Sequence, residues 1–344
     1  MRIAGVSHRA LREAGDGAAI VVIDQTLLPG RVELARLASL EDIVRAICSM
    51  QVRGAPLIGV TAAYGVALAL RDNPSDAGLA GAAASLRRAR PTAINLGWAV
   101  GRIEDAVRSL PVEARAAAAW RTAAALAEAE VEACAAIGRH GAALLSTRLA
   151  GRGVDRPLSI LTHCNAGWLA TVDWGTALAP VYRLHDEGFP VHVWVSETRP
   201  RNQGLLTAWE LGQHGVPFTL VVDNAAGLLL TQQRVDVCLV GADRITRRGD
   251  VCNKIGTSLK ALAAEDAAIP FYVAAPVSTI DWTLDEPGSI PIEERDAAEV
   301  TEAAGLPVFN PGFDVTPARR VTAIITERGV SAASAEGLSA LAAG

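Results

Sequence analysis

The stretch Leu-Ser-Ile-Leu-Thr-His-Cys-Asn at residues 158–165 is a short apolar run that ends in a polar turn. Its length and composition are those of a buried strand. Further runs of this kind follow, and helix-like sequence fills most of the gaps between them. These runs are Val191–Ser196, Phe218–Val222, Val235–Val240 and Phe271–Ala274. Strands that alternate with helices predict an α/β fold with a parallel sheet covered by helices on both faces.

The sequence before this stretch has a different pattern. Ala19–Asp24 reads as a strand that ends before the turn at Pro29-Gly30. From Val32 to Leu149 the pattern is helical and rich in alanine. Residues 151–157 read as a linker. We therefore predict a smaller, mostly helical N-terminal domain that begins with short strands (residues 1–150), followed by the parallel-sheet domain (residues 151–344).

Composition narrows the class of protein. The chain has 344 residues, half of them apolar, and a formal net charge of -5, which argues against nucleic-acid and anionic-membrane partners. Its longest apolar run, Leu57–Leu70, is too short to cross a membrane, and no secretory signal is recognisable. The five cysteines have no metal-ligand spacing. We expect a cytoplasmic protein with reduced thiols and no metal.

Polar or glycine-containing turns follow the predicted strands at residues 163–165, 197–199, 223–224 and 241–244. In open α/β sheets, ligands bind at the carboxyl ends of the strands. Each turn alone is equally well explained as a helix cap or a loop. Together, they predict one crevice lined by these turns.

Cys164 lies between a predicted strand and a predicted helix. The positive end of the helix dipole would lower the pKa of the thiol and favour thiolate, which suits a base, a nucleophile or an electrostatic stabiliser. The alternative is an inert buried cysteine. The neighbouring His163 would point to the opposite face of the strand, so we expect a structural role for it.

Asp243 follows the strand that ends at Val240. A carboxyl group in an apolar pocket has a raised pKa and can serve as a general acid. A helix or turn cap, or an ion pair with Arg244, explains the same position equally well.

Several cations are candidates for anion binding. Of the 32 cationic residues only Lys254 and Lys260 are lysine, so a retained lysine is of interest. Lys254 precedes a helical stretch, where backbone N–H groups and an ammonium group could hold an anion. Arg53, followed by Gly54 at a helix start, could bind phosphate in a forked geometry. Each of these positions is also compatible with a solvated surface residue, as is the charge run that ends at Arg90.

Taken together and in this order, these segments resemble the methylthioribose-1-phosphate isomerase family. That family is related to ribose-1,5-bisphosphate isomerases and to regulatory subunits of the exchange factor for eukaryotic translation initiation. The resemblance spans almost the whole chain. It rests on the motifs at residues 23–29, 53–56, 90–92, 162–167, 201–204, 241–244, 252–257 and 310–317. One departure is Gly312, where the family pattern has alanine.

The resemblance implies a role for each matching residue. Asp243 would be the proton donor and Cys164 the transition-state stabiliser or base. Contacts to a phosphorylated pentose would come from Arg53, Gly54, Ala55, Arg90, Gln203, Asn253 and Lys254. The resemblance further implies a Rossmann-like C-terminal domain and a homodimer, without a metal or an organic cofactor.

The implied reaction is the aldose–ketose conversion of 5-methylthio-α-D-ribose 1-phosphate to 5-methylthio-D-ribulose 1-phosphate, in methionine salvage, a route of methionine biosynthesis. Phosphate on C1 blocks the usual ring opening, so an acid is needed at the ring oxygen and a base or stabiliser near C2. Three alternatives stay open. They are the same chemistry on 5-deoxyribose 1-phosphate, the same chemistry on ribose 1,5-bisphosphate, and a non-catalytic regulatory subunit that binds sugar phosphates or nucleotides.

Overall fold

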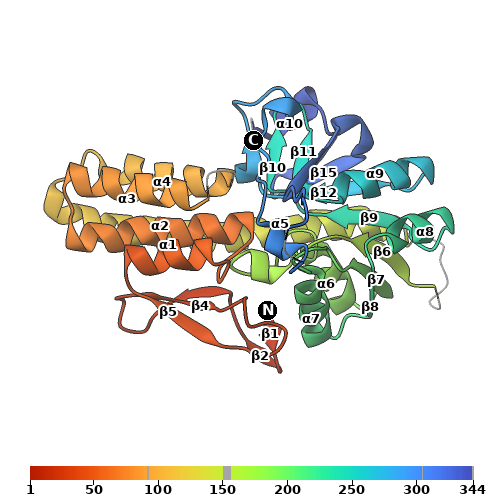
Figure 1. Ribbon diagram of the computed structural model, residues 1–344, viewed down its shortest axis with the longest axis horizontal. Coiled ribbons are helices and arrows are strands. Elements are labelled where there is room, and N and C mark those ends of the chain that lie inside the picture. Colours follow the sequence, from red (N-terminus) through yellow and green to blue (C-terminus); the bar gives the residue numbers. More distant parts are fainter. Residues whose placement is uncertain (91–92, 150–155, 304, 343–344) are drawn as a thin grey trace.

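The computed structural model describes residues 1–90, 93–149, 156–303 and 305–342 (Figure 1). The chain begins with short antiparallel strands, which confirms the predicted strand-rich start. They form a pair, β1 (Arg2–Ile3) and β2 (Val6–Ser7), and a three-stranded sheet, β3 (Leu11–Glu13), β4 (Ile20–Ile23) and β5 (Leu34–Leu37). Strand β4 is the strand predicted at Ala19–Asp24.

Five helices follow, and the first of them begins later than predicted. They are α1 (Leu40–Cys48), α2 (Ala55–Asp72), α3 (Asp76–Ala89), α4 (Ile94–Val107) and α5 (Val112–Ser146). The helical pattern predicted from Val32 is wrong for its first residues, because β5 pairs with β4 there and buries Leu37. Helix α1 then starts after Ser39, which forms a reciprocal capping box with Asp42.

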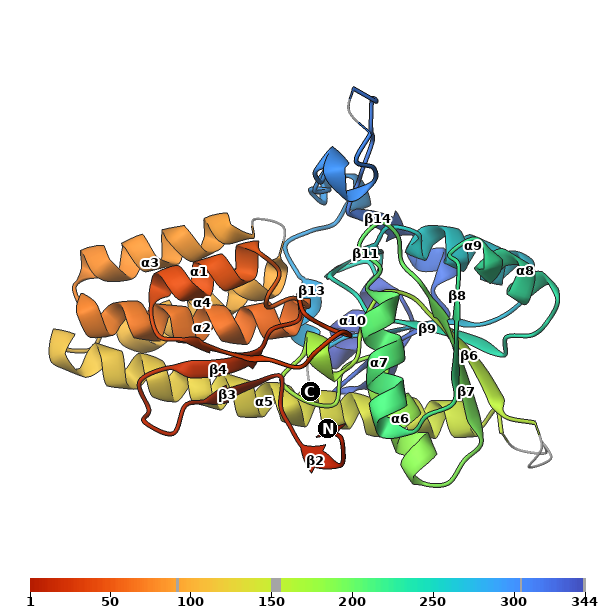
Figure 2. The same cartoon turned by 60° about the horizontal axis from the view of Figure 1, so that its bottom comes forward.

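Helix α2 is the centre of the helical part. It is apolar on all sides and buried along nearly its whole length, and it packs against α1, α3, α4 and α5. A helix without a polar face is stable in water only when neighbours cover it on every side. This packing fixes the N-terminal end of α2, which points toward the second half of the molecule (Figure 2).

The second half is built on a seven-stranded sheet with the order β16-β15-β12-β9-β6-β7-β8. All its pairs are parallel except β15 with β16. The strands are β6 (Leu158–Thr162), β7 (Val191–Ser196), β8 (Phe218–Val221), β9 (Val237–Val240), β12 (Phe271–Ala274), β15 (Ala323–Thr326) and β16 (Gly329–Ser331). The five predicted strands are confirmed, whereas β15 and β16 were not predicted.

Helices cover both faces of this sheet, as predicted. One face packs against α5 and against α6 (Ala179–Asp186) and α7 (Gly204–His214). The other packs against α8 (Ala225–Thr231), α9 (Thr257–Asp266) and α10 (Ala335–Ala342). Neighbouring strand residues alternate between the two cores, so that Ile160 belongs to one and Leu161 to the other. Burial on both faces explains why these strands read as continuous apolar runs.

A second, smaller sheet was not predicted. Its order is β13-β10-β11-β14, with β10 (Arg244–Thr246), β11 (Val251–Lys254), β13 (Ile280–Asp281) and β14 (Phe313–Thr316). These strands are two to four residues long. Their pairing depends on partners far apart in the chain, such as Val251 and Thr316. Between β13 and β14 the chain makes an excursion that projects from the rest of the molecule in Figure 2.

The two halves share helix α5, which has 35 residues and so a length of about 50 Å. Figure 2 shows it running from beneath α2 to α6. Gly141 of α5 lies so close to Pro180 that a Cβ atom there would overlap the proline ring. The division into domains at residue 150 stays a prediction, and residues 151–155 of the predicted linker lie outside the described residues. None of the helices in the described ranges combines the length and apolar composition of a membrane span.

Candidate active site

The order of the parallel strands determines where a ligand can bind. From β6 the chain adds β7 and β8 on one side, and then β9, β12 and β15 on the other side. The direction of winding therefore reverses between β6 and β9. At such a switch point the loops that leave the two strands diverge and open a crevice at their carboxyl ends. Cys164 follows β6 and Asp243 follows β9, so both residues lie at this point.

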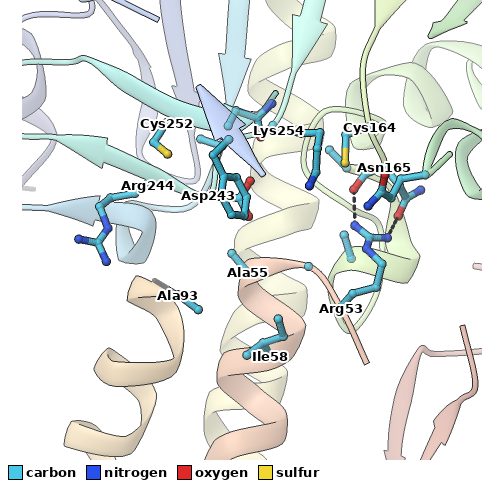
Figure 3. A pocket seen from close by; sticks show the side chains of 18 of the residues that line it. Arg53, Ala55, Ile58, Ala93, Cys164, Asn165, Asp243, Arg244, Cys252 and Lys254 are labelled. Atoms are coloured by element: carbon cyan, nitrogen blue, oxygen red, sulfur yellow. Dashed lines mark hydrogen bonds between the residues drawn. The ribbon is translucent and has the colours of Figure 1, made fainter. Parts of the chain in front are cut away.

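A pocket occupies the switch point (Figure 3). It is closed from the helical side by the start of α2 and the residues before α4. Every site residue predicted from the sequence lines it: Arg53, Gly54, Ala55, Arg90, Cys164, Gln203, Asp243, Asn253 and Lys254. Four cations, those of Arg53, Arg90, Arg244 and Lys254, line the pocket of a chain whose net charge is -5. This local positive charge makes the pocket a candidate site for an anion.

Cys164 is held by hydrogen bonds of its own backbone. It has a left-handed conformation with φ 64°. Its N–H donates to Thr198 Oγ1 at 2.8 Å, and its carbonyl oxygen accepts from Thr207 Oγ1 at 2.8 Å. In Figure 3 the sulfur atom points into the pocket toward Lys254.

The predicted low pKa of this thiol is wrong. No helix begins at Cys164, because β6 leads into a loop and then a single 3₁₀ turn at Trp168–Ala170, and α6 starts only at Ala179. The helix dipole that would favour thiolate is therefore missing. Burial raises the pKa of Cys164, although the charges of Arg53 and Lys254 act in the opposite direction. The resting group is a neutral thiol.

Asp243 has the raised pKa that was predicted. Burial of the carboxyl group is the main cause, opposed by the positive charges of Lys254, Arg90 and Arg53 and reinforced by the negative charge of Glu293. The backbone N–H of Asp243 donates to the carbonyl oxygen of Cys252 at 2.9 Å, which fixes the residue at the start of the small sheet. A carboxyl group held in this way can keep its proton and donate it.

Lys254, on β11, is buried with 8% of its surface exposed. Burial lowers its pKa, whereas Cys164 and Asp243 favour its charged form. Its Nζ lies 4.8 Å from the centre of the Phe313 ring. In Figure 3, Lys254 projects into the pocket between Asp243 and Cys164.

The anion site predicted at the helix after Lys254 is not available. Asp314 occupies the N-terminal end of α9, where it accepts hydrogen bonds from the N–H groups of Gly256 at 2.8 Å and Ser258 at 3.1 Å. Asn253 is held there too, donating to Thr257 Oγ1 at 3.0 Å. These donors are satisfied within the protein, so only the lysine of this motif is left for an anion.

The N-terminal end of α2 lines the pocket, and within the described part of the chain no side chain caps it as Asp314 caps α9. Gly54 is the N-cap of α2 and makes no side-chain cap hydrogen bond, and Gly54 and Ala55 both line the pocket. Gly54 has φ 93°, and a Cβ atom there would overlap the main chain of Ala170, so only glycine fits. The backbone N–H groups at this end can bind an anion in the pocket.

Arg53 is less free than predicted. Its guanidinium donates to the carbonyl oxygen of Asn165 at 2.7 Å and to Asn165 Oδ1, and both bonds are drawn in Figure 3. A third contact reaches Gln25 Oε1 at 3.5 Å. Part of its forked geometry is thus used to hold the loop that carries Cys164.

Arg90 and Gln203 approach from other sides. Arg90 Nε lies 3.4 Å from Glu293 Oε2, a carboxylate of the excursion between β13 and β14. The two other residues of its motif, Pro91 and Thr92, lie outside the described residues.

Gln203 is 5% exposed, and its Oε1 has no hydrogen-bond partner in the part of the chain that the structure describes. An amide oxygen buried in this way needs a partner, which a hydroxyl group in the pocket would supply.

Sequence reasoning missed two residues that organise the site. Glu210 of α7 is fully buried and accepts from Asn165 Nδ2 at 2.9 Å, from the N–H groups of Trp168 and Leu169 at 3.0 Å, and from the hydroxyl of Tyr182 at 2.8 Å. Glu293 lies in the excursion. A single carboxylate in the mostly apolar helix α7 was a signal for Glu210, whereas no pattern marked Glu293.

The chain is similar in sequence and in structure to known proteins. Residues 51–333 match the Initiation factor 2 subunit family. A methylthioribose-1-phosphate isomerase from Methylorubrum populi is 58% identical, over 99% of this chain and 98% of that protein. The structure of 5-methylthioribose 1-phosphate isomerase from Pyrococcus horikoshii OT3 has a TM-score of 0.85 and 37% identity, over 98% of this chain and 96% of the other. The translation initiation factor eIF-2B, subunit delta, from A. fulgidus has a TM-score of 0.78 and 40% identity, over 95% and 96%.

Proposed function

Because the chain belongs to the Initiation factor 2 subunit family, with relatives named methylthioribose-1-phosphate isomerase at 58% identity, we propose that it is an isomerase of this kind. It converts 5-methylthio-α-D-ribose 1-phosphate into 5-methylthio-D-ribulose 1-phosphate. The observation that carries the proposal is a carboxyl group with a raised pKa, Asp243, in one pocket with the thiol of Cys164 and the ammonium group of Lys254.

The phosphate group binds among the cations of the pocket. Lys254 supplies an ammonium group, Arg90 a guanidinium and the start of α2 its backbone N–H groups at Gly54 and Ala55. Arg53 contributes positive charge from its place beside Asn165. Asn253 and Gln203 line the same pocket and hydrogen-bond the sugar hydroxyls. Binding through the phosphate fixes the distance from C1 to the chemical groups.

The chemistry has two steps. Asp243 donates its proton to the ring oxygen, and the ring opens while the phosphate stays on C1. Hydrogen then moves from C2 to C1, and the C2 hydroxyl loses its proton to the Asp243 carboxylate, which gives the ketose and restores the acid. Burial keeps Asp243 protonated for the first step. A neutral Cys164 thiol is a weak base, so the raised pKa of Cys164 favours its role as a stabiliser of charge near C2.

The route of the hydrogen is open to a direct measurement. With deuterium at C2 of the substrate, a hydride shift carries the label to C1 of the product, whereas proton transfer through an enediol exchanges it with solvent. If Cys164 only stabilises charge, we expect the product to retain the deuterium. Complete loss of deuterium to solvent would instead assign Cys164 as the base.

The pocket lining supports an apolar group at C5 of the sugar. The side chains of Met50, Ile58, Ile290 and Phe313 form part of its wall. A methylthio group can bury its surface against them. A second phosphate at C5, as in ribose 1,5-bisphosphate, would lose water against these apolar side chains. A 5-deoxy sugar leaves a void rather than a clash and should react more weakly.

A second function, sugar-phosphate or nucleotide binding without turnover, is favoured by the likeness to the eIF-2B delta subunit. One assay separates the two. Purified protein is incubated with 5-methylthioribose 1-phosphate, 5-deoxyribose 1-phosphate and ribose 1,5-bisphosphate, and ketose formation is measured. If the protein is an isomerase, we expect ketose to form fastest from 5-methylthioribose 1-phosphate. Binding of all three without ketose formation would support the regulatory function.

We also propose that the protein is a cytoplasmic homodimer that serves methionine salvage. Exposed apolar side chains support the dimer: they lie on the edge strand β8 and just beyond it (Phe218, Leu220, Val222) and on α8 and α9 (Leu228, Leu259, Leu262). Their burial by a second copy would remove this surface from water. Light scattering on the eluting protein measures the mass, which would be twice that of one chain.

A further inference from the structure

Two residues at the carboxyl edge of the sheet have left-handed backbones although neither is glycine. Cys164 has φ 64° and Thr198 has φ 66°. For a β-branched residue such as threonine this conformation is strained. It persists only where the surrounding contacts hold it, and such strain clusters at functional sites.

A hydrogen bond joins these two residues. Thr198 Oγ1 accepts from the backbone N–H of Cys164 at 2.8 Å, and the same hydroxyl donates to the carbonyl oxygen of Ser196 at 3.0 Å. Thr198 is completely buried. The hydroxyl proton of Thr198 therefore points toward Ser196, and a lone pair of its oxygen faces the N–H of Cys164. Without this acceptor, the N–H of Cys164 would lose its partner in the protein.

A carboxylate holds Thr198 in place in turn. Asp223 Oδ1 accepts from Ser196 Oγ at 2.6 Å and from the N–H of Thr198 at 2.9 Å, and Oδ2 accepts from the N–H of Arg199 at 2.7 Å. Lys260 Nζ lies 3.7 Å from Oδ1 and is only 4% exposed. Three hydrogen bonds and a buried cation therefore fix the loop at residues 196–199.

His163 also connects the loop to the residue after Lys254. His163 Nε2 donates to the carbonyl oxygen of Ile255, the residue after Lys254, at 2.7 Å. Its Nδ1 lies 3.4 Å from Thr198 Oγ1. Thr198 therefore contacts the segment after β6 directly and is linked through His163 to the segment after β11.

We propose that Thr198 and Asp223 are positioning residues for Cys164: Asp223 fixes Thr198, and Thr198 holds the Cys164 backbone so that the sulfur stays in the pocket. This inference rests on the proposed isomerase function for its kinetic consequence, because a reacting group must keep its place to well within 1 Å. It assigns these residues no contact with the substrate.

The test replaces only the hydroxyl group. Thr198→Val keeps the branched shape, whereas Thr198→Ser keeps the hydroxyl. With Thr198→Val we expect kcat to fall roughly 10- to 100-fold, while KM stays close to the wild-type value because the phosphate contacts are intact. Thr198→Ser should restore kcat to nearly that of the wild type. Asp223→Asn, which turns an amide N–H₂ toward a backbone donor, should repeat the kcat loss.

A second readout does not depend on turnover. Iodoacetamide labelling of Cys164 is followed by peptide mass spectrometry, with the exposed Cys48 of the same molecule as the internal standard. In Thr198→Val the rate at Cys164 relative to Cys48 should fall several-fold, because the sulfur leaves the cations beside it, and in Thr198→Ser it should stay unchanged. If the wild-type protein formed no ketose, the proposed function would fail, but this labelling ratio would still decide the positioning. A Thr198→Val protein with the wild-type kcat and labelling ratio would overturn the inference.

Discussion

Arg53 donates a 2.7 Å hydrogen bond to the main-chain carbonyl oxygen of Asn165, and thereby ties the start of α2 to the loop of Cys164. A second bond goes to the side-chain oxygen of Asn165, so the planar guanidinium fixes both parts of one residue. The helical half and the sheet half of the molecule meet at this contact. A substrate bound as proposed would therefore keep its position relative to the chemical groups of the sheet half.

Arg53→Lys tests this contact. A lysine keeps the charge but cannot make the two parallel bonds, so we expect kcat/KM to fall about 100-fold or more. A lower kcat and a higher KM should both contribute to this fall, because the loop of Cys164 loses a contact that holds it in place. Arg71→Lys, an exposed arginine that donates to the carbonyl oxygen of Gly17, is the matched control and should keep the wild-type rate. Equal rates for the two variants would contradict the bracing role.

Glu210→Gln tests the support behind that contact. One carboxylate accepts bonds from Asn165, Tyr182 and two backbone N–H groups, whereas a glutamine presents only one oxygen. At least one buried donor is left unsatisfied, which should lower the free energy of unfolding by about 2 kcal/mol. Urea denaturation measures the loss. Glu187→Gln, at the exposed end of α6, should cost far less, and a similar loss in both would argue against a specific role for Glu210.

Glu293→Gln tests the carboxylate that faces Arg90. Burial is the main cause of the raised pKa of Asp243, and the charge of Glu293 adds to it. Without this charge the pKa of Asp243 should fall, so the alkaline limb of the kcat profile should move to lower pH. Arg90 loses its 3.4 Å carboxylate partner, so KM should fall several-fold. The neighbouring, exposed Glu294→Gln is the control, and an unshifted limb in Glu293→Gln would show that Glu293 does not act on Asp243.

Glu130 makes stability depend on pH. Burial raises its pKa from 4.5 to about 7, although it accepts hydrogen bonds from Cys134 Sγ and from the N–H of Val172, both at 2.9 Å. The folded state thus binds the proton more tightly than the unfolded state. The stability it gives is complete below pH 4.5 and is lost as pH rises to about 7, up to about 3 kcal/mol. In Glu130→Gln, unfolding free energies between pH 5 and 7 should slope less than in the wild type; parallel slopes would contradict the assignment.

Local sequence patterns predicted much of the fold. The strands β6, β7 and β12 begin and end where their apolar runs do, because a strand buried on both faces needs apolar side chains at every position. The run Ala323–Thr326 has the same character and could have been predicted as β15. Strand β10 could not, since its three residues are ordered only by pairing with β11 and β13.

The sequence predicted that these residues would meet in one pocket, and it predicted the raised pKa of Asp243 but not that of Cys164. The turns after β6 and β9 lie together because of the strand order, which a pattern of parallel strands suggests. The pKa of Cys164 depends instead on a missing helix and on burial. Likewise, Asp314 caps α9 from 58 residues beyond Gly256, and no local pattern contains that contact. Long-range contacts decide which charges and donors are left for the substrate.

The most direct test of the proposed function is the rate of ketose formation from 5-methylthioribose 1-phosphate by the wild-type protein and by Asp243→Asn. An amide cannot donate the proton that opens the ring, so we expect turnover by the wild type and a loss of about 1,000-fold in kcat for the variant. Asp266→Asn, an exposed aspartate at the end of α9, should match the wild type. An unchanged rate in Asp243→Asn would contradict the role of Asp243 as the acid, and no ketose from the wild-type protein would contradict the isomerase function.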